Sequence, residues 1–282
     1  MTARVGFVGL GTMGRAIAEN TLRAGFDLMV FDLRDEPMRE LEALGAKRAR
    51  SSRDVGEHAE IVQLALPDDA AVDAAVLGED GVLVGARAGA VIAIHSTIHP
   101  RTAKRIAEQA RAKGVAVVDA QMTGAQTGAR SQSLTFMVGG EAAAVERCRP
   151  VLEASGKHIF HMGELGAGAT TKAAQQAVTV INVMAAMEGF RFAERAGIDM
   201  EAFCRVLSSS TAQSYVIDNR MGLGERTGDG DQRRPFHRGL RAVLSLAFDL
   251  DVPMPATALA QQTIPWGPTY PLPLDGGGLG RG

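Results

Sequence analysis

Residues 5–14 read VGFVGLGTMG, and this stretch decides the fold. Val5–Gly9 is a short apolar run typical of a buried parallel strand, and a helical pattern follows the last glycine. Gly9 permits a tight turn, Gly11 lets the backbone approach a diphosphate, and Gly14 allows close packing of helix on strand. A strand, a glycine turn and a helix in this order predict a dinucleotide-binding loop, with the helix N-terminus facing the diphosphate.

An acidic residue stands where such a loop needs one. The run Asp27–Phe31 predicts a second strand, and Asp32 follows it, 21 residues after Gly11. The competing interpretation is a glycine-rich turn followed by an unrelated surface aspartate. A carboxylate here accepts hydrogen bonds from the adenosine ribose and repels a 2′-phosphate, which favours NAD over NADP. Arg34 can accommodate a phosphate, so NADP stays open as an alternative cofactor.

Strands continue to alternate with helices after this unit. Ala59–Leu66 and Ala90–Ile94 predict strands, Pro100 opens a helix, and Val115–Asp119 predicts the next strand. The alternation predicts an α/β fold with a doubly wound parallel sheet of the Rossmann type, whose ligands lie beyond the carboxyl ends of the strands. The candidate cofactor-binding residues at this rim are Gly9, Leu10, Gly11, Thr12, Met13, Gly14, Asp32, Leu33, Arg34, Leu66, Pro67, Ser96 and Thr97.

Two stretches of this rim have competing interpretations. Ser96 and Thr97 precede Pro100, and either of them can instead cap the helix that begins there. Residues 120–140 read AQMTGAQTGARSQSLTFMVGG, in which Thr123 and Gly124 can present a hydroxyl and bare backbone N–H groups to a small carboxylate. Taken alone, this stretch is better explained as a solvated loop between strands.

A long helix follows the sheet. Residues 166–197, GAGATTKAAQQAVTVINVMAAMEGFRFAERAG, contain no proline, and apolar residues stand on every side, so we expect a buried helix. Polar interruptions exclude a membrane span. Lys172 stands at its entrance, with Gln175 and Gln176 on nearby faces of the same turn. The lysine either reaches water along the helix surface, or lies in a cleft with a lowered pKa for proton transfer.

Composition limits the other possibilities. The chain has 282 residues and a net charge of −2, which suggests one large or two moderate domains and gives no basic field for nucleic acid or an anionic membrane. We expect no signal peptide and a cytoplasmic protein, in which Cys148 and Cys204 are free thiols without metal or redox spacing. The six histidines form no metal signature, so we expect no metal site.

Together these motifs resemble those of the β-hydroxyacid dehydrogenases, the family of 3-hydroxyisobutyrate dehydrogenase and tartronate semialdehyde reductase. The matching segments are GFVGLGTMG (6–14), the Ser96-Thr97-x-x-Pro100 loop, DAQMTGA (119–125) and GAGATTKAAQQ (166–176). The resemblance implies an NAD(P)-binding Rossmann domain over residues 1–163 and an all-helical substrate and oligomerisation domain over 164–282. It also implies a homodimer or homotetramer.

The resemblance also implies an activity and its residues. The reaction is hydride transfer between NAD(P) and a small 3-hydroxy acid or its semialdehyde, with Lys172 as the catalytic acid and base. Thr123 and Gly124 would hold the substrate carboxylate, beside Ala125. Gln176 stands where the family has a substrate-binding asparagine, next to Gln175.

This chain departs from the family around the substrate. The family's Asp-Ala-Pro-Val-Ser-Gly-Gly is DAQMTGA here, so a proline becomes Gln121 and a glycine becomes Ala125. His95 replaces an aspartate or a small residue. These changes bear on the identity of the acid more than on the reaction type.

Other functions remain open. An imine reductase shares this architecture but typically replaces the lysine with another proton donor, so Lys172 argues against it. A dinucleotide-binding homologue with impaired catalysis is a further alternative. A 6-phosphogluconate dehydrogenase is disfavoured, because the chain is short and shows no sugar-phosphate clamp.

The last quarter of the sequence departs most from the pattern of the family. Asp199 is expected to cap a helix over Met200–Leu207. Residues 222–239 carry no helical period, and the family's Lys-Asp pair reads Arg238-Gly239 there. Residues 263–282 are rich in proline and glycine where the family has its last helix. We therefore expect irregular structure in both segments and hypothesise that both are read in a shifted frame, which rereading the gene in the other frames would test.

Overall fold

The computed structural model describes residues 3–219 and 233–263 and divides the chain into two compact units, residues 1–172 and 173–282. The first unit is built on one eight-stranded sheet with the strand order β3-β2-β1-β4-β5-β6-β7-β8. The strands are β1 Arg4–Val8, β2 Asp27–Phe31, β3 Lys47–Arg48, β4 Ile61–Leu64, β5 Val91–Ile94, β6 Ala116–Thr123, β7 Leu134–Gly139 and β8 Gly156–Gly163. The predicted doubly wound Rossmann fold is confirmed.

One strand pair corrects the expectation of a fully parallel sheet. β6 and β7 are antiparallel, with Asp119 opposite Gly139 and Thr123 opposite Thr135. The connection between them holds only the short helix α7 (Ala125–Arg130), and a parallel pair needs a longer crossover. β6 also extends to Thr123, so part of the expected loop is strand.

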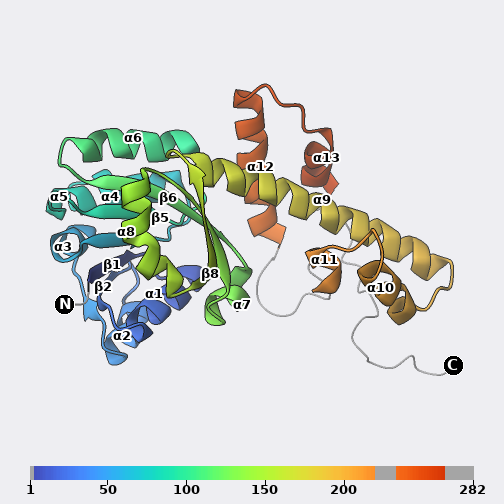
Figure 1. Cartoon of the computed structure of the whole chain (residues 1–282), viewed down its shortest axis with the longest axis horizontal. Coiled ribbons are helices and arrows are strands. Elements are labelled where there is room, and N and C mark those ends of the chain that lie inside the picture. Colours follow the sequence, from blue (N-terminus) through green and yellow to red (C-terminus); the bar gives the residue numbers. More distant parts are fainter. Residues whose placement is uncertain (1–2, 220–232, 264–282) are drawn as a thin grey trace. The chain divides into compact units, whose positions relative to one another are not determined.

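Helices flank this sheet and bury an apolar core on both of its faces (Figure 1). Neighbouring residues of β1 show the alternation, because Phe7 belongs to the apolar cluster on one face and Val8 to the cluster on the other. The remaining helices of this unit are α1 Thr12–Arg23, α2 Asp35–Ala43, α3 Ser52–His58, α4 Asp69–Leu77, α5 Val82–Gly85, α6 Pro100–Arg111 and α8 Ala142–Glu153.

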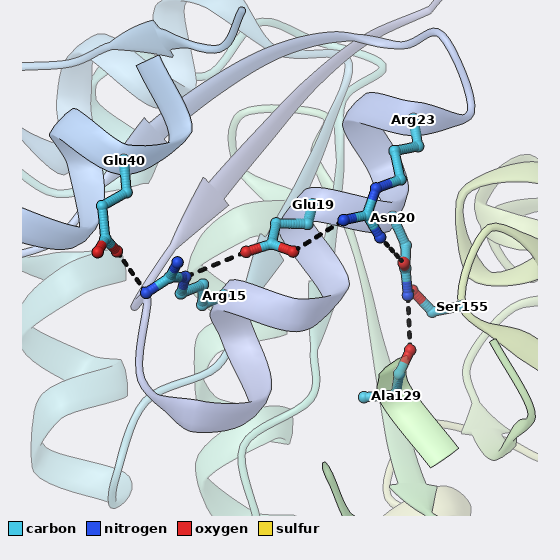
Figure 2. A network of polar contacts seen from close by, with 7 residues as sticks. All are labelled: Arg15, Glu19, Asn20, Arg23, Glu40, Ala129 and Ser155. Carbon is cyan, nitrogen blue, oxygen red and sulfur yellow. Dashed lines mark hydrogen bonds and ion pairs between the residues drawn. The ribbon is translucent and has the colours of Figure 1, made fainter. Parts of the chain in front are cut away.

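Helix α1, which follows the glycine loop, is fixed by a buried asparagine. The side-chain amide of Asn20 donates to the carbonyl oxygen of Ala129 at the end of α7 (2.7 Å) and to Oγ of Ser155 (3.1 Å), as Figure 2 shows. On the exposed side, ion pairs link Arg15 and Arg23 to Glu19, and Arg15 to Glu40. The glycine loop therefore begins a helix that is held to α7, which directly follows Thr123 and Gly124.

The second unit is helical. Its elements are the last part of α9 (Ala167–Arg195), α10 Met200–Ser208, α11 Tyr215–Asp218, α12 Arg233–Asp249 and α13 Pro255–Thr263. Phe190 on α9 packs edge-on against Phe203 on α10, with ring centroids 5.5 Å apart, inside an apolar cluster with α11. Asp199 accepts a hydrogen bond from the backbone N–H of Ala202 (2.7 Å), so the predicted cap of α10 is confirmed.

Two expectations about the helical unit need correction. The long helix is not buried all round, because Val178 is 59% and Phe192 is 77% exposed: α9 packs one face on the other helices of this single chain. The segment 222–239 is not irregular throughout, because α12 begins at Arg233 and Pro235 lies in its first turn, where no N–H is needed. Residues 220–232 and 264–282, and with them most of the proposed frame-shifted sequence, lie outside the described residues.

The part of the chain that the structure describes contains neither a membrane-spanning helix nor a metal-binding cluster. No helix there is long and apolar enough to cross a membrane. Nor do three or more His, Cys, Asp or Glu side chains gather there to hold a metal ion.

Candidate functional site

The glycine loop lies directly after β1. Gly9 has a φ of +93° and donates its N–H to the carbonyl oxygen of Phe31 (2.9 Å). A side chain at Gly14 would overlap the carbonyl oxygen of Gly9, so α1 can approach the turn only because this residue is glycine. A Cβ at Gly11 would meet no described atom within 4 Å. The loop therefore leaves open space before the N-terminus of α1, where Thr12 and Met13 begin the helix, and this cradle suits a diphosphate.

Asp32 lies against this loop, at the end of β2. One carboxylate oxygen accepts the backbone N–H of Leu10 (2.6 Å), and the other accepts the backbone N–H (2.9 Å) and Nε (3.0 Å) of Arg34. Burial alone raises the pKa of Asp32, but these hydrogen bonds outweigh burial and leave the pKa below its ordinary value. Asp32 is thus an anion at neutral pH, and Leu33 beside it is 95% exposed.

The ends of β4 and β5 meet through Ser96. Its hydroxyl accepts the backbone N–H of Leu66 at 2.7 Å, while Pro67 and Thr97 are exposed beside this contact. The alternative that Ser96 or Thr97 caps α6 is wrong, because the residue directly before Pro100 is the N-cap: the side chain of His99 accepts the N–H of Arg101.

The carboxyl end of β6 carries Gln121, where the family has a proline, and its role depends on contacts that the sequence alone does not reveal. Its amide nitrogen donates to the carbonyl oxygens of Ile94 (3.2 Å) and Ser96 (2.8 Å), so it fixes the loop after β5. Among the described residues, its buried amide oxygen has no hydrogen-bond partner. Two residues on, Thr123 is half-buried at the end of the same strand.

The loop after Thr123 has an unusual backbone. Gly124 has a φ of +126°, and Ala125, where the family has glycine, still has a φ of +54°. A residue other than glycine in the left-handed region costs about 1–2 kcal/mol, and such strain concentrates at functional sites.

His95 does not belong to the rim. It is 3% exposed and lies between Phe7 and Phe136, with Nδ1 2.8 Å from the carbonyl oxygen of Ala120 and Nε2 2.9 Å from the amide oxygen of Gln63. Burial lowers the pKa of His95 to about 4, so the ring is neutral at pH 7. The sequence-based view that His95 bears on the identity of the acid is therefore corrected: it packs in the sheet core.

Lys172 lies in the second turn of α9 and still belongs to the first unit. The first turn of this helix is held by Asp119 of β6, whose two carboxylate oxygens accept the N–H groups of Gly166 (2.8 Å) and Ala169 (2.6 Å). Burial lowers the pKa of Lys172 to about 8, and its side chain is half-buried. Sequence reasoning gave Asp119 no role, although a carboxylate inside an apolar strand demands buried partners.

Gln175 and Gln176 follow on α9 within the second unit. Gln175 donates to the hydroxyl of Thr179 at 2.8 Å. The amide of Gln176 lies so close to Gly239 of α12 that a side chain at position 239 would overlap it. The side chain of Gln176, which is one methylene longer than the family's asparagine, thus fills the space that the missing side chain of Gly239 leaves.

The predicted residues of the first unit therefore form three connected groups. Leu10, Asp32 and Arg34 meet beside the glycine loop, the hydroxyl of Ser96 accepts the N–H of Leu66, and the helix that carries Lys172 is tied to β6 through Asp119. The first two groups lie at the carboxyl ends of strands, where ligands of such sheets bind, and the third joins α9 to the middle of β6.

Two family models match the chain. Residues 4–163 match the NAD-binding domain of 6-phosphogluconate dehydrogenase, and residues 166–266 match the NAD-binding domain of NADP-dependent 3-hydroxyisobutyrate dehydrogenase. These matches cover both structural units and show that the chain uses NAD or NADP.

Individual relatives agree with the family models. The chain is 33% identical to the NAD-dependent L-serine dehydrogenase of Pseudomonas aeruginosa, over 94% of this chain and 88% of that protein. It is also 33% identical to the 2-hydroxy-3-oxopropionate reductase of Escherichia coli, over 92% and 89%. Among solved structures, the 3-hydroxyisobutyrate dehydrogenase of Mycobacterium tuberculosis with L-serine has a TM-score of 0.85 at 25% identity, covering 94% of this chain and 93% of that one.

Solved structures of lower sequence identity give weaker evidence about function. Solved imine reductases are 20–22% identical to this chain, a likeness that shows the fold alone. The matches over both units, together with the glycine loop, Asp32 and the helix that carries Lys172, place the chain as an NAD(P)-dependent oxidoreductase of the β-hydroxyacid dehydrogenase family.

Proposed function

We propose that the protein interconverts a small 3-hydroxy acid and its semialdehyde by hydride transfer with NAD(P), and that Lys172 is the general acid and base. One observation carries the proposal: an amine whose pKa burial lowers to about 8 stands on a helix that two hydrogen bonds fix to β6. An ordinary lysine, with a pKa of about 10.4, is rarely neutral at pH 7, whereas a pKa of about 8 gives this amine a larger neutral fraction there.

The residues of the first unit fit the dinucleotide. Gly11 and the N-terminus of α1 would hold the diphosphate, and Asp32 would accept the ribose hydroxyls, beside the exposed Leu33. Bound there, the cofactor supplies the two-electron redox chemistry. The anionic Asp32 favours NAD. Arg34, 64% exposed, is placed to turn toward a 2′-phosphate, so we expect slower use of NADP instead of none.

Lys172 accounts for the proton. In the oxidising direction its neutral amine removes the proton of the substrate hydroxyl, while the hydride leaves the carbon that bears this hydroxyl. In the reducing direction its ammonium returns a proton to the carbonyl oxygen. Each direction therefore needs the opposite protonation state of one group, which a pKa near 8 makes accessible in both.

The substrate carboxylate would be held by the loop after β6. Thr123 offers a hydroxyl and Gly124 an N–H group, and the strained φ of +54° at Ala125 supports a functional reason for this backbone. Gln176, with Gln175 beside it, would contact the rest of the substrate in place of the family's asparagine. Because its relatives include an L-serine dehydrogenase and a 3-hydroxyisobutyrate dehydrogenase, L-serine and 3-hydroxyisobutyrate are the first acids to test.

A panel of acids tests the proposed function. The purified protein is incubated with L-serine, 3-hydroxyisobutyrate and other small 3-hydroxy acids, each with NAD⁺ and with NADP⁺, and the reduced cofactor is followed by absorbance. We expect turnover of at least one 3-hydroxy acid, faster with NAD⁺. Lactate, whose hydroxyl lies one carbon closer to the carboxylate, is the matched control and is expected to be inert.

The other outcomes separate the alternatives. Cofactor binding without turnover of any member of the panel would favour a catalytically impaired homologue, and turnover of a cyclic imine alone would favour an imine reductase. A domain boundary between residues 163 and 164, a homodimer or homotetramer, and a cytoplasmic location remain predictions.

A further inference from the structure

A buried carboxyl group with no part in the proposed reaction contacts the helix that carries Lys172. Asp119 lies in the middle of β6, is fully buried, and belongs to neither the cofactor loop nor the proposed substrate loop. Its two oxygens accept N–H groups from two residues of one helical turn, Gly166 and Ala169, which lie 47 and 50 residues away in sequence. A carboxylate of the sheet therefore caps α9 from outside the helix.

The surroundings of Asp119 are shaped for this contact. A side chain at Gly139, opposite it on β7, would overlap its Oδ1 atom, and a Cβ at Gly168 would lie 2.8 Å from its Oδ2 atom. Two glycines thus leave room for the carboxylate to enter the first turn. Burial raises the pKa of Asp119, and the backbone N–H groups partly offset this, so its charge depends on these hydrogen bonds.

The first turn of α9 fixes the position of Lys172 on the next turn. Lys172 is the third residue after Ala169, which places it about 4.5 Å further along the helix axis. The free N–H groups of a helix N-terminus favour a negative charge, so the carboxylate both satisfies two of them and holds the helix end to β6. If this contact is lost, the first turn of α9 loses two hydrogen bonds to β6, and the sheet no longer fixes the position of Lys172.

We propose that Asp119 is the positioning residue of Lys172: it caps α9 from β6 and so fixes where the amine lies. The role rests on the proposed function, in which Lys172 is the acid and base. Asp119 touches neither substrate nor reacting atoms in this account; it acts through the helix.

The test uses Asp119→Asn and Asp119→Ala, with Asp199→Ala as the matched control. Asp199 caps α10 through the N–H of Ala202 (2.7 Å), so its loss also removes a carboxylate cap but leaves α9 untouched. Asparagine at position 119 keeps one acceptor and turns an amide toward the second N–H group, so we expect it to retain part of the function. Thermal unfolding checks that each variant folds.

The first readout needs no substrate. The full-length protein is acetylated over a range of pH, and the modification of Lys172 is followed by peptide mass spectrometry. In the wild type we expect half-maximal reactivity near the pKa of about 8. Asp119→Ala should move this midpoint up toward the ordinary lysine pKa of about 10.4, because the amine of Lys172 becomes hydrated. Asp119→Asn should fall between the two, and Asp199→Ala should stay at the wild-type midpoint.

The second readout separates positioning from general stability. With the best acid of the panel, Asp119→Ala should lower kcat by about 10–100-fold, the effect of a small misplacement of a reacting group, with NADH affinity unchanged. An unchanged Lys172 midpoint in both Asp119 variants, a shift to lower pH, or an equal shift in Asp199→Ala would each overturn the proposal. Because acetylation is read without turnover, a failed acid panel would refute the proposed function and still leave the role of Asp119 measurable.

Discussion

Lys172→Ala is expected to lower kcat by about 10²–10⁴-fold in both directions, which is the usual contribution of a positioned acid or base. The variant removes the amine whose pKa burial lowers to about 8 and leaves the glycine loop and Asp32 in place. NADH binding, measured by fluorescence titration, should therefore match the wild type. Steady-state kinetics with the best acid of the panel provide the comparison.

Two further substitutions control this experiment. Lys172→Arg keeps the positive charge but cannot give up its proton near neutral pH, so it should be as inactive as alanine in the oxidising direction. Lys157→Ala removes an exposed lysine of β8 and should keep full activity. Retention of most of the wild-type kcat in Lys172→Ala would exclude the assigned role.

Gly14→Ala should have the largest effect on cofactor binding. Its new methyl group would overlap the carbonyl oxygen of Gly9, which is backbone and cannot turn aside, so α1 must move away from the loop. Overpacking of this kind costs about 1–3 kcal/mol. We expect the thermal midpoint to fall by about 2–10 °C and the NADH affinity to fall by about tenfold or more.

Gly11→Ala provides the matched comparison in the same loop. Gly11 has a φ of −67°, which alanine adopts freely, and a Cβ there meets no described atom within 4 Å. The free protein should therefore keep its thermal midpoint, while the methyl group enters the space proposed for the diphosphate and weakens NADH binding. Wild-type NADH affinity in both glycine variants would contradict the assignment of this loop.

The sequence was sufficient for those parts of the fold that local patterns encode. β2 spans Asp27–Phe31 as expected, α6 begins at Pro100, and Asp199 caps α10, because apolar runs, proline at the first helical position and a capping side chain each act over a few residues. The resemblance to the dehydrogenase family rests on four short motifs of the same kind, and the family models confirm it.

Features that depend on distant partners could not be read in this way. The cap that Asp119 forms on α9 and the use of the space at Gly239 by Gln176 each join residues far apart in sequence. The long helix shows the same limit: its composition indicated burial on every side, whereas exposure depends on what packs against it, and Phe192 is 77% exposed.

The pH dependence of kcat/KM tests the central claim most directly. In the oxidising direction only the neutral amine of Lys172 can accept the substrate proton, so kcat/KM should rise with pH and level off above the lowered pKa of about 8. In the reducing direction only the ammonium form donates, so kcat/KM should fall over the same range. Opposite inflections near this pH are the predicted result. Profiles that are flat between about pH 7 and 9, or that bend the same way in both directions, would contradict the account.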